Sequence, residues 1–233
     1  MSALIETKQD RFFDVITAIL LIILCAIVLY PLILVVSSSF SDPVDVMANR
    51  VVLLPVHLNL SSYKMVLHHP EIGKSYFNTI VYTVVGVLIN LIFTTLGAYP
   101  LSRRDFYGRG VFTAIFTFTM FFGGGMIPSY ILVKELGLLD TIWALVLPGA
   151  VSTWNLIVMR SFFQNSIPME LQESAFIDGA NDIKVLLRIV IPLSTPIMAV
   201  MTLFYGVGHW NSWFSALLYL SDRQKYPLQM ILR

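Results

Sequence analysis

The sequence predicts an all-α, polytopic membrane protein, and three observations lead to this fold class. Of the 233 residues, 57% are hydrophobic and 12% are charged, whereas a soluble domain averages about 25% charged residues. Five apolar runs are each long enough to cross a hydrocarbon core as a helix, which takes about 20 residues. The net charge of +1 gives no sign of a nucleic-acid partner. We therefore expect residues 1–233 to form a single transmembrane domain with five spans.

The first expected span covers residues 12–40 and follows a short charged stretch at the N-terminus. Its apolar run is too long for a cleaved signal peptide, so we expect a retained helix with a kink at Pro31. The single cysteine, Cys25, lies in this run and is expected to act as a small apolar residue, since it has no partner for an intrachain disulfide. The other expected spans are residues 76–101, 111–133, 141–163 and 193–220.

The third expected span contains the stretch "FFGGGMIPSY", with three glycines at 123–125 and Pro128. This stretch fits either a hinge or gate, or a helix end that turns into an outer loop. Because the charged residues Lys134 and Glu135 follow soon after, the sequence favours the helix end.

Basic residues set the expected orientation. The N-terminal stretch and the loops after the second and fourth spans hold eight Lys and Arg: Lys8, Arg11, Arg103, Arg104, Arg109, Arg160, Lys184 and Arg188. The opposite loops hold four: Arg50, Lys64, Lys74 and Lys134. The positive-inside rule then places the N-terminus and the loop 164–192 in the cytoplasm. The last segment, "SDRQKYPLQMILR", would lie outside and lead into a sixth span that this chain lacks.

The first half of the loop 164–192 carries the signals of a short helix. Asn165 or Ser166 is expected to cap it, and Pro168 lies in its first turn, where a missing N–H costs nothing. Glu170 and Glu173 follow in the N-terminal half, where the helix dipole favours negative charge.

A bend and a second helix complete this loop. Gly179 is expected to end the first helix in a left-handed conformation that disfavours residues with a Cβ. Asn181 or Asp182 would cap the second helix. Its expected apolar face consists of Ile183, Leu186, Leu187 and Val190. Small residues at the bend and the carboxylates of the first helix would suit insertion into a groove of a partner. The alternative is a surface loop packed on its own bundle.

The stretch "ESAFIDGANDIKVLLRIVIPLSTP" resembles the cytoplasmic Glu-Ala-Ala motif of bacterial ABC importer permeases. Ser174 replaces the middle alanine of that motif, and Ile191 replaces a leucine. The matching positions are Glu173, Ala175, Asp178, Gly179, Ala180, Ile189 and Pro192. Two wider segments, "FFGGGMIPSYILVKELGLLDTIWALVLPG" and "FFQNSIPMELQESAFIDGA", are similar to the MalG-like subunit of carbohydrate-uptake importers. More narrowly, the chain resembles permeases for complex or acidic oligosaccharides, such as alginate importers, which usually have six spans.

The resemblance implies a type I ABC importer permease fold and a place in a heteromeric complex of the bacterial cytoplasmic (inner) membrane. This chain would form half of the pathway for an oligosaccharide, beside a second permease, two cytoplasmic ATPases and an extracytoplasmic sugar-binding protein. The sequence has no G-x-x-x-x-G-K-[ST] phosphate loop. We therefore expect no catalytic residue, cofactor or metal here, with ATP and Mg used by the ATPases. The implied coupling residues are Glu170, Glu173, Ser174, Ala175, Asp178, Gly179, Ala180 and Asn181.

Polar and aromatic residues at membrane depth are candidates for the sugar pathway: Asn90, Trp154, Asn155, Tyr205, His209, Trp210 and Asn211. The aromatic and amide groups of "YGVGHWNSWF" would suit a sugar ring. Hydrogen bonds between helices are the favoured alternative for Asn90 and Asn155. His209 can serve the same purpose, and tryptophan is common at membrane interfaces.

Two other function classes are less well supported by the sequence. An ion-coupled secondary transporter of a small polar solute would need charged groups inside its spans, and the expected spans have none away from their ends. A membrane enzyme would need a metal-ligand cluster, a nucleophile with its base or paired carboxylates. The adjacent His68 and His69 are too weak a pattern to predict a metal site.

Overall fold

The computed structural model describes residues 8–233, and side chains from residue 11 onward. The side chain of Lys8, counted above among the inner basic residues, therefore lies outside the described part. Within residues 8–233 every regular element is a helix, as the all-α prediction requires. The chain forms two compact units, Met1–Pro70 and Glu71–Arg233.

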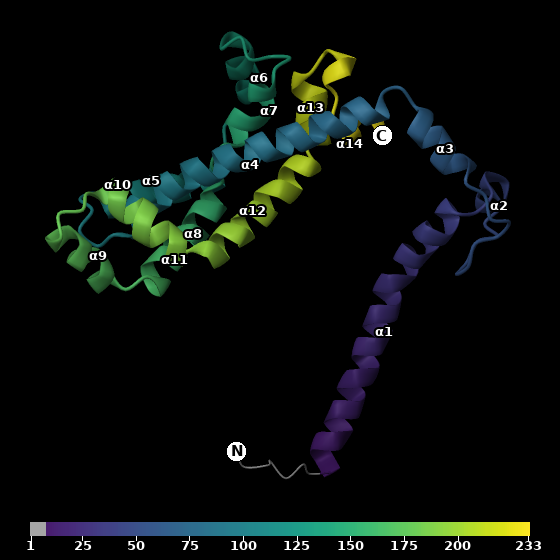
Figure 1. Ribbon diagram of the computed structural model, residues 1–233, viewed down its shortest axis with the longest axis horizontal. Helices are drawn as coiled ribbons and strands as arrows, with labels where there is room; N and C mark the ends of the chain where they lie inside the picture. The colour runs from purple at the N-terminus through teal and green to yellow at the C-terminus, as the bar shows by residue number, and fades with distance from the viewer. Residues whose placement is uncertain (1–7) are drawn as a thin grey trace. The chain divides into compact units, whose positions relative to one another are not determined.

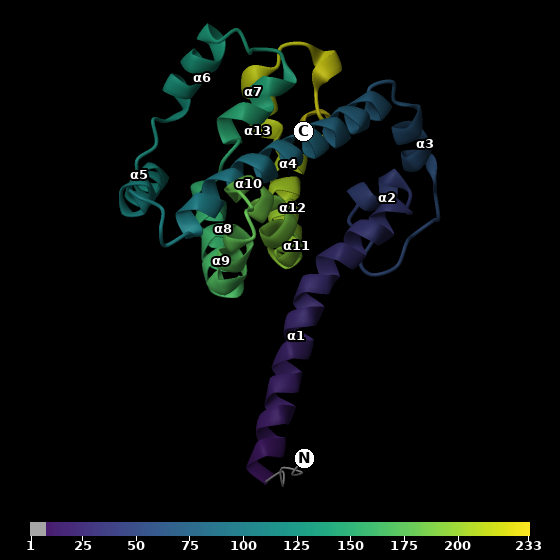
Figure 2. The same ribbon diagram turned by 60° about the vertical axis from the view of Figure 1, so that its left-hand side comes forward.

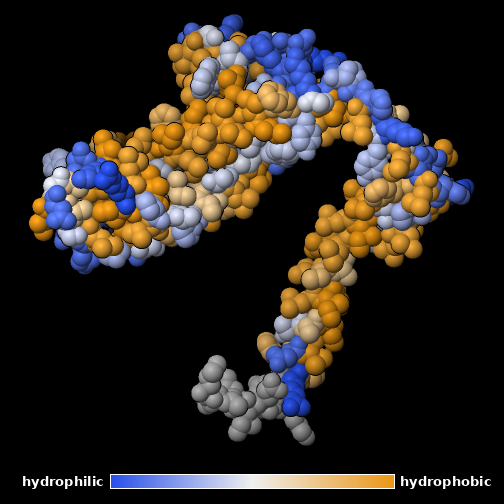
Figure 3. Space-filling model, in the orientation of Figure 1, coloured by the Kyte–Doolittle hydropathy of each residue, from blue (hydrophilic) through white to orange (hydrophobic). Residues whose placement is uncertain are grey.

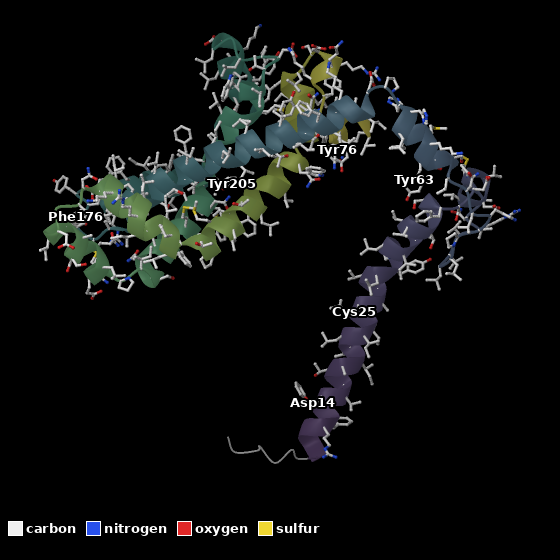
Figure 4. All side chains as sticks on the ribbon, viewed as in Figure 1. Asp14, Cys25, Tyr63, Tyr76, Phe176 and Tyr205 are labelled. Carbon is white, nitrogen blue, oxygen red and sulfur yellow. The ribbon has the colours of Figure 1, made fainter. Side chains whose placement is uncertain are left out.

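The first unit is dominated by α1 (Lys8–Ser39), which continues through Pro31. This helix agrees with the first expected span to within a few residues. Its side chains are exposed almost throughout, and Figure 3 shows hydrophobic residues covering most of its length. Cys25 is exposed on this helix (Figure 4). A long apolar helix with almost no buried side chains needs lipid or another protein around it.

Two short helices, α2 (Pro43–Met47) and α3 (Ser61–His68), follow α1 in this unit. The carboxylate of Asp45 is buried and holds the loop after α2 through Arg50 at 3.2 Å and His57 at 2.7 Å. The hydrogen bond from His57 is the main cause that lowers the pKa of Asp45. This cluster therefore closes the loop onto the unit with charge-assisted bonds.

The second unit is built around α4 (Ile72–Ser102), which covers the second expected span. Both α8 (Thr153–Ser166) and α12 (Thr195–Trp210) run alongside it (Figures 1 and 2). Fully buried side chains fill the space between these helices, among them Leu156, Met159 and Met201. These three helices form the core on which the other elements of the unit depend.

The third expected span is not one helix. Its residues form α5 (Arg109–Phe121) and α6 (Met126–Glu135), which meet at 110°. Gly125 has φ +84° at the start of α6, a conformation that glycine adopts without a steric cost. The stretch "FFGGGMIPSY" thus ends one helix and begins another in a new direction, so the expected span over 111–133 is interrupted at these glycines.

The fourth and fifth expected spans are also broken. α7 (Ile142–Val146) and η1 (Leu147–Gly149) join α8 at 55°. The segment Asp182–Leu193 joins α12 at 83°, and the fifth span ends at Trp210 before α13 (Trp213–Tyr219). By length and composition, the described residues contain two helices able to cross a membrane, α1 and α4, or up to five spans if each bent pair counts as one.

A smaller apolar cluster lies where α6, α7 and α13 meet, with Val133, Ala144 and Tyr219 buried in it. The chain then passes through η3 (Arg223–Lys225) and α14 (Leu228–Ile231). Asp140, which precedes α7, binds Lys225 Nζ at 2.8 Å. This ion pair fixes the last described loop to the start of α7.

Candidate functional site

An elbow of four short helices (residues 169–193) connects α8 to α12. It consists of α9 (Met169–Ile177), α10 (Asp182–Val185), the π-helical η2 (Leu186–Val190) and α11 (Ile191–Leu193). Figure 1 shows α9 and α10 near one end of α4, away from α13 and α14. The elbow contains every residue of the sequence motif that pointed to a coupling role.

Gly179 makes the bend between α9 and α10, as the sequence predicts. Its φ is +77°, and its N–H donates to Phe176 O at 3.0 Å, while the N–H of Ala180 donates to Ala175 O at 2.9 Å. This pair of bonds is a Schellman motif, which satisfies carbonyls at a helix end and favours glycine. No atom lies within 4 Å of where a Cβ on Gly179 would be, so the backbone conformation alone demands glycine there.

The two helix caps of the elbow differ from each other in how well the sequence predicts them. Asn181 caps α10, because its Oδ1 accepts a hydrogen bond from Lys184 N at 2.9 Å. The expected cap of α9 by Asn165 or Ser166 is wrong: both residues belong to the last turn of α8, and Pro168 occupies the cap position. Because α8 extends to Ser166, Asn165 and Ser166 are part of that helix and do not occupy the position that caps α9.

The second limb of the elbow (residues 182–193) buries only part of the predicted face, whereas α9 forms the first limb. Val185, Leu186 and Val190 are buried, whereas Ile183 and Leu187 are 67% and 58% exposed. Residues 186–190 form a π-helix, whose i→i+5 turns are wider than those of an α-helix. The wider turn changes the spacing of the side chains that point toward the bundle, so the 3.6-residue pattern correctly identifies Leu186 and Val190 but not Val185.

The predicted coupling residues lie mainly on the exposed side of the elbow. Glu170, Glu173, Ser174, Asp178, Gly179 and Asn181 are exposed, whereas Ala175 and Ala180 are partly buried against the core. Ile177 at the end of α9 is 87% exposed. A groove of about 400 Å³ lies on this side, and its lining includes Leu171, Asp178, Arg188 and Leu193. The exposed side thus combines carboxylates with apolar side chains.

Arg103, at the C-terminal end of α4, is the residue of this site that the sequence analysis missed. Its Nη1 donates to Asp182 Oδ1 at 3.1 Å, and its guanidinium carbon lies 4.6 Å from the centre of the Phe176 ring. It also clamps Asp105 and, through this hydrogen bond, lowers the pKa of that carboxyl. Asp182 is 79 residues away in sequence, so no local pattern reveals the pairing.

Three of the predicted pathway residues meet in a buried polar network. Asn90 on α4 is fully buried, and its Nδ2 donates to Gly149 O at 2.7 Å and Ala150 O at 2.9 Å. Since carbonyls only accept, the amide orientation is fixed and Oδ1 faces His209, whose Nε2 lies 2.6 Å away and donates to it. Asn90 therefore joins α4 to the η1–α8 break and to α12. This agrees with the alternative in which Asn90 makes hydrogen bonds between helices.

Tyr205 on α12 makes the second connection of this network. Its hydroxyl lies 2.7 Å from Thr94 Oγ1 and accepts a hydrogen bond from Ser152 N at 3.3 Å. Figure 4 labels Tyr205 where α12 runs beside α4. Hydrogen bonds thus link α4, the η1–α8 break and α12 at two positions, Asn90 and Thr94, which are one turn apart along α4.

The other predicted pathway residues lie outside this network. Trp154 is 59% exposed on the first turn of α8, and the neighbouring Asn155 is buried. Trp210 packs edge-on against Tyr76 with ring centres 5.8 Å apart. Asn211 is exposed at the end of α12. These four residues remain predictions for the pathway.

No protein-family model matches the sequence, but known proteins are similar over almost all of it. The chain is 42% identical over 225 residues to the "Polygalacturonan/rhamnogalacturonan transport system permease protein YtcP" of Bacillus subtilis (strain 168), covering 97% of this chain and 78% of that protein. It is 44% identical over 228 residues to "Protein LplC" of the same organism, covering 98% of this chain and 77% of that protein.

A solved structure is similar as well. The crystal structure of a bacterial ABC transporter involved in the import of the acidic polysaccharide alginate has a chain with a TM-score of 0.92 and 41% identity. The match covers 99% of this chain and 82% of that chain. Sequence relatives and structural neighbour agree with the motif in the elbow and with the all-α fold. The chain therefore belongs to the family of carbohydrate ABC importer permease subunits.

Proposed function

We propose that this chain forms one half of the translocation pathway of an ATP-driven oligosaccharide importer and that its elbow docks on a cytoplasmic ATPase. The observation that carries the docking role is the division of the elbow into two sides. Val185 and Val190 are buried in the core of the unit, while Glu173 and Ile177 are exposed on the other limb. An element anchored in the bundle on one side and open on the other suits the transfer of a partner's movement to the helices.

The exposed side also indicates the chemistry of the partner surface. Glu170, Glu173 and Asp178 offer carboxylates to basic groups, and Leu171 and Ile177 offer apolar contact. A charged rim around apolar contacts is the usual composition of a protein interface. We propose that Glu173 pairs with a basic residue of the ATPase and that Ile177 enters an apolar depression there.

ATP and Mg²⁺ are proposed to bind to the partner ATPases, with hydrolysis confined to them. This division is supported by the permease family and by the lack of a phosphate-loop sequence. A second permease and an extracytoplasmic sugar-binding protein complete the proposed complex. The closed ATPase pair would bind the outward-facing state of the permeases more tightly than the inward-facing state. Closure would therefore shift the permeases toward the outward-facing state.

The proposed cargo is an oligosaccharide, and acidic oligosaccharides are the first candidates. The support comes from the alginate importer and from the relative named for polygalacturonan and rhamnogalacturonan. Asn90, Tyr205 and His209 use their polar groups between helices, so Trp154 is the better first candidate for contact with sugar because its ring is exposed. Replacement of Trp154 by alanine tests this role by its effect on uptake.

The orientation is proposed from the basic residues: the N-terminus and the elbow share the cytoplasmic side of the inner membrane. A thiol introduced by Ser174→Cys, in a chain with Cys25→Ser, should react with a membrane-impermeant maleimide in inside-out vesicles and not in right-side-out vesicles. The reverse pattern contradicts both the orientation and the docking role.

The docking role is tested in proteoliposomes that hold this chain with its second permease, ATPases and binding protein. Gly179→Val forces a branched side chain into a left-handed conformation and should abolish uptake or detach the ATPases. Gly179→Asn is the matched control, since asparagine tolerates this conformation, and should retain most uptake. Full ATPase binding and full uptake with Gly179→Val would refute the proposal.

A further inference from the structure

Arg103 occupies a position between the end of α4 and both limbs of the elbow. It is the cap residue of α4, and its N–H donates to Pro100 O. Its side chain is 12% exposed, so its charge is largely withdrawn from water. A cation at this end of a helix is favoured by the helix dipole.

The guanidinium contacts the elbow on either side of the bend at Gly179. Phe176, in the last turn of α9, lies under its face at 4.6 Å, and Asp182, in the first turn of α10, accepts from Nη1 at 3.1 Å. A change in the angle between α9 and α10 would have to break one of these contacts. Arg103 therefore fixes that angle from outside the elbow.

The same guanidinium is held on the side of α4. Nη1 donates to the hydroxyl of Tyr99, one turn earlier in α4, at 3.3 Å, and Nε donates to Asp105 Oδ1 at 2.9 Å. These contacts use a planar fork of N–H groups that lysine does not have. The position of the charge relative to α4 is therefore set by geometry as well as by attraction.

The two limbs of the elbow differ in how firmly they are anchored. The second limb is buried in the core through Val185, Leu186 and Val190. The first limb, α9, exposes most of its residues, including Ile177. Force applied to α9 can reach the bundle through its buried Gln172 and through contacts near the bend, where Arg103 makes a charged contact.

We propose that Arg103 is the positioning residue that makes α9, α10 and α4 move together, so that movement of a docked ATPase reaches the transmembrane core. The inference rests on the proposed docking of the elbow. α4 lies against both α8 and α12, so a displacement delivered to its end acts on the helices that hold the buried network. Arg103 contacts an aromatic ring, Phe176, before the bend and a carboxylate, Asp182, after it.

The test compares Arg103→Gln with Arg104→Gln in proteoliposomes containing the complete importer. Arg104 is adjacent and exposed, and within the described side chains no polar contact joins it to the elbow, so it controls for the loss of one positive charge. With Arg103→Gln, the ATPases should stay bound and hydrolyse ATP, while sugar taken up per ATP falls about fivefold or more, the lower end of typical coupling between sites. Arg104→Gln should leave that ratio unchanged.

Two further variants separate positioning from charge alone. Arg103→Lys keeps the charge without the fork and should stay well below the wild-type ratio. Asp182→Asn should also lower the ratio, and combining it with Arg103→Gln should add little, because both changes remove the same contact between Arg103 and Asp182. A wild-type ratio with Arg103→Gln or with Arg103→Lys overturns the inference, as does loss of the ATPases with Arg103→Gln.

A cross-linking measurement distinguishes failure of this inference from failure of the docking role. Ser174→Cys, in the Cys25→Ser chain, is cross-linked to the ATPase in both the Arg103 and the Arg103→Gln backgrounds. A cross-link in both, with an unchanged ratio of uptake to hydrolysis, removes the role of Arg103 and leaves the docking role standing. No cross-link with Arg103 intact removes the docking role, and this inference with it.

Discussion

The imidazole of His209 on α12 occupies the space that a side chain on Gly86 of α4 would need. A Cβ built on Gly86 would lie 2.6 Å from Cδ2 of His209, closer than van der Waals contact allows. Gly86 is buried one turn from Asn90, the residue that His209 binds. The glycine thus lets α12 approach α4 closely enough for that hydrogen bond, which is how small residues act at helix interfaces in membranes.

Gly86→Ala should destabilise the protein by about 1–3 kcal/mol, because the added methyl group overpacks the interface and pushes His209 away from Asn90. Thermal unfolding of the chain purified in detergent checks this. Combining it with His209→Ala should cost less than the sum of the two single changes, since the clash disappears with the ring.

The control for this prediction is Gly73→Ala in the first turn of the same helix. Nothing lies within 4 Å of a Cβ built there, and alanine favours helix over glycine by about 1 kcal/mol. Gly73→Ala should therefore be neutral or stabilising. Equal destabilisation by the two alanines would show that close approach at Gly86 is not the cause.

Asn90→Ala should cost about 2 kcal/mol or more, because Asn90 is fully buried and its loss leaves two part-buried carbonyls and the N–H of His209 without partners. Asn78→Ala is a matched control: Asn78 lies in the same helix and also donates to two carbonyls, Gln224 O at 2.9 Å and Tyr226 O at 3.2 Å. Its surroundings are partly exposed, so water can replace the lost bonds and the cost should be under about 1 kcal/mol. Denaturation of both variants in the same detergent gives the comparison. The prediction fails if Asn90→Ala is the milder change.

Asn181→Ala removes the cap of α10 and should cost about 1 kcal/mol of local stability, whereas Asn181→Ser should cost little because serine also caps helices. Hydrogen exchange of the amides at 182–185 measures this directly. Faster exchange with alanine and near wild-type exchange with serine are expected. Equal exchange in all three proteins would mean that the hydrogen bond from Lys184 N to Asn181 Oδ1 contributes nothing to the start of this helix.

Local signals in the sequence were enough to predict the bend of the elbow. Gly179 and Asn181 act through bonds to residues within a few positions, so their roles follow from helix-end chemistry alone. The exposed side of α9 follows from its carboxylates. The first two spans were also predicted to within a few residues, because a continuous apolar run of about 30 residues has one simple interpretation in a membrane.

Other features depend on contacts that sequence cannot specify. The buried face of the second limb was predicted only in part: Leu186 and Val190 are buried, but Ile183 and Leu187 are exposed. The π-helix at 186–190 changes the period, and nothing in the apolar pattern reveals it. The pairing of Arg103 with Asp182 joins the end of α4 to the start of α10, which are 79 residues apart in sequence. The breaks in the later spans had visible glycines and prolines, such as Gly125, but hydropathy alone does not distinguish a bent pair from one straight helix.

Asp140 is the centre of a charged cluster whose contribution should depend on pH. Its Oδ1 accepts from Ser221 N at 3.1 Å and Asp222 N at 3.0 Å, and its Oδ2 binds Lys225 Nζ at 2.8 Å. The hydrogen bond from Lys225 is the main cause that lowers the pKa of Asp140, and the same bond raises the pKa of Lys225. The charged form of each residue is therefore favoured in the folded state.

The signs of the two shifts set the pH window. A carboxyl with a lowered pKa stabilises the fold above its unfolded pKa of about 3.9 and loses that contribution as pH falls through the folded value. An amine with a raised pKa stabilises below its unfolded pKa of about 10.4 and loses that contribution as pH rises through the folded value. The contribution of the pair should therefore be constant across neutral pH and disappear at both extremes.

Asp140→Asn isolates this charge, because Asp140 has φ +61° and asparagine tolerates that conformation with the same shape. The melting temperature of the variant should lie below that of the wild type near pH 7, and the gap should close as pH falls below about 4. Asp222→Asn is the control, since Asp222 lies 3.9 Å from Lys225 Nζ and should give a smaller gap. A gap that widens on acidification, or none at neutral pH, would contradict an ionised Asp140 that stabilises the fold.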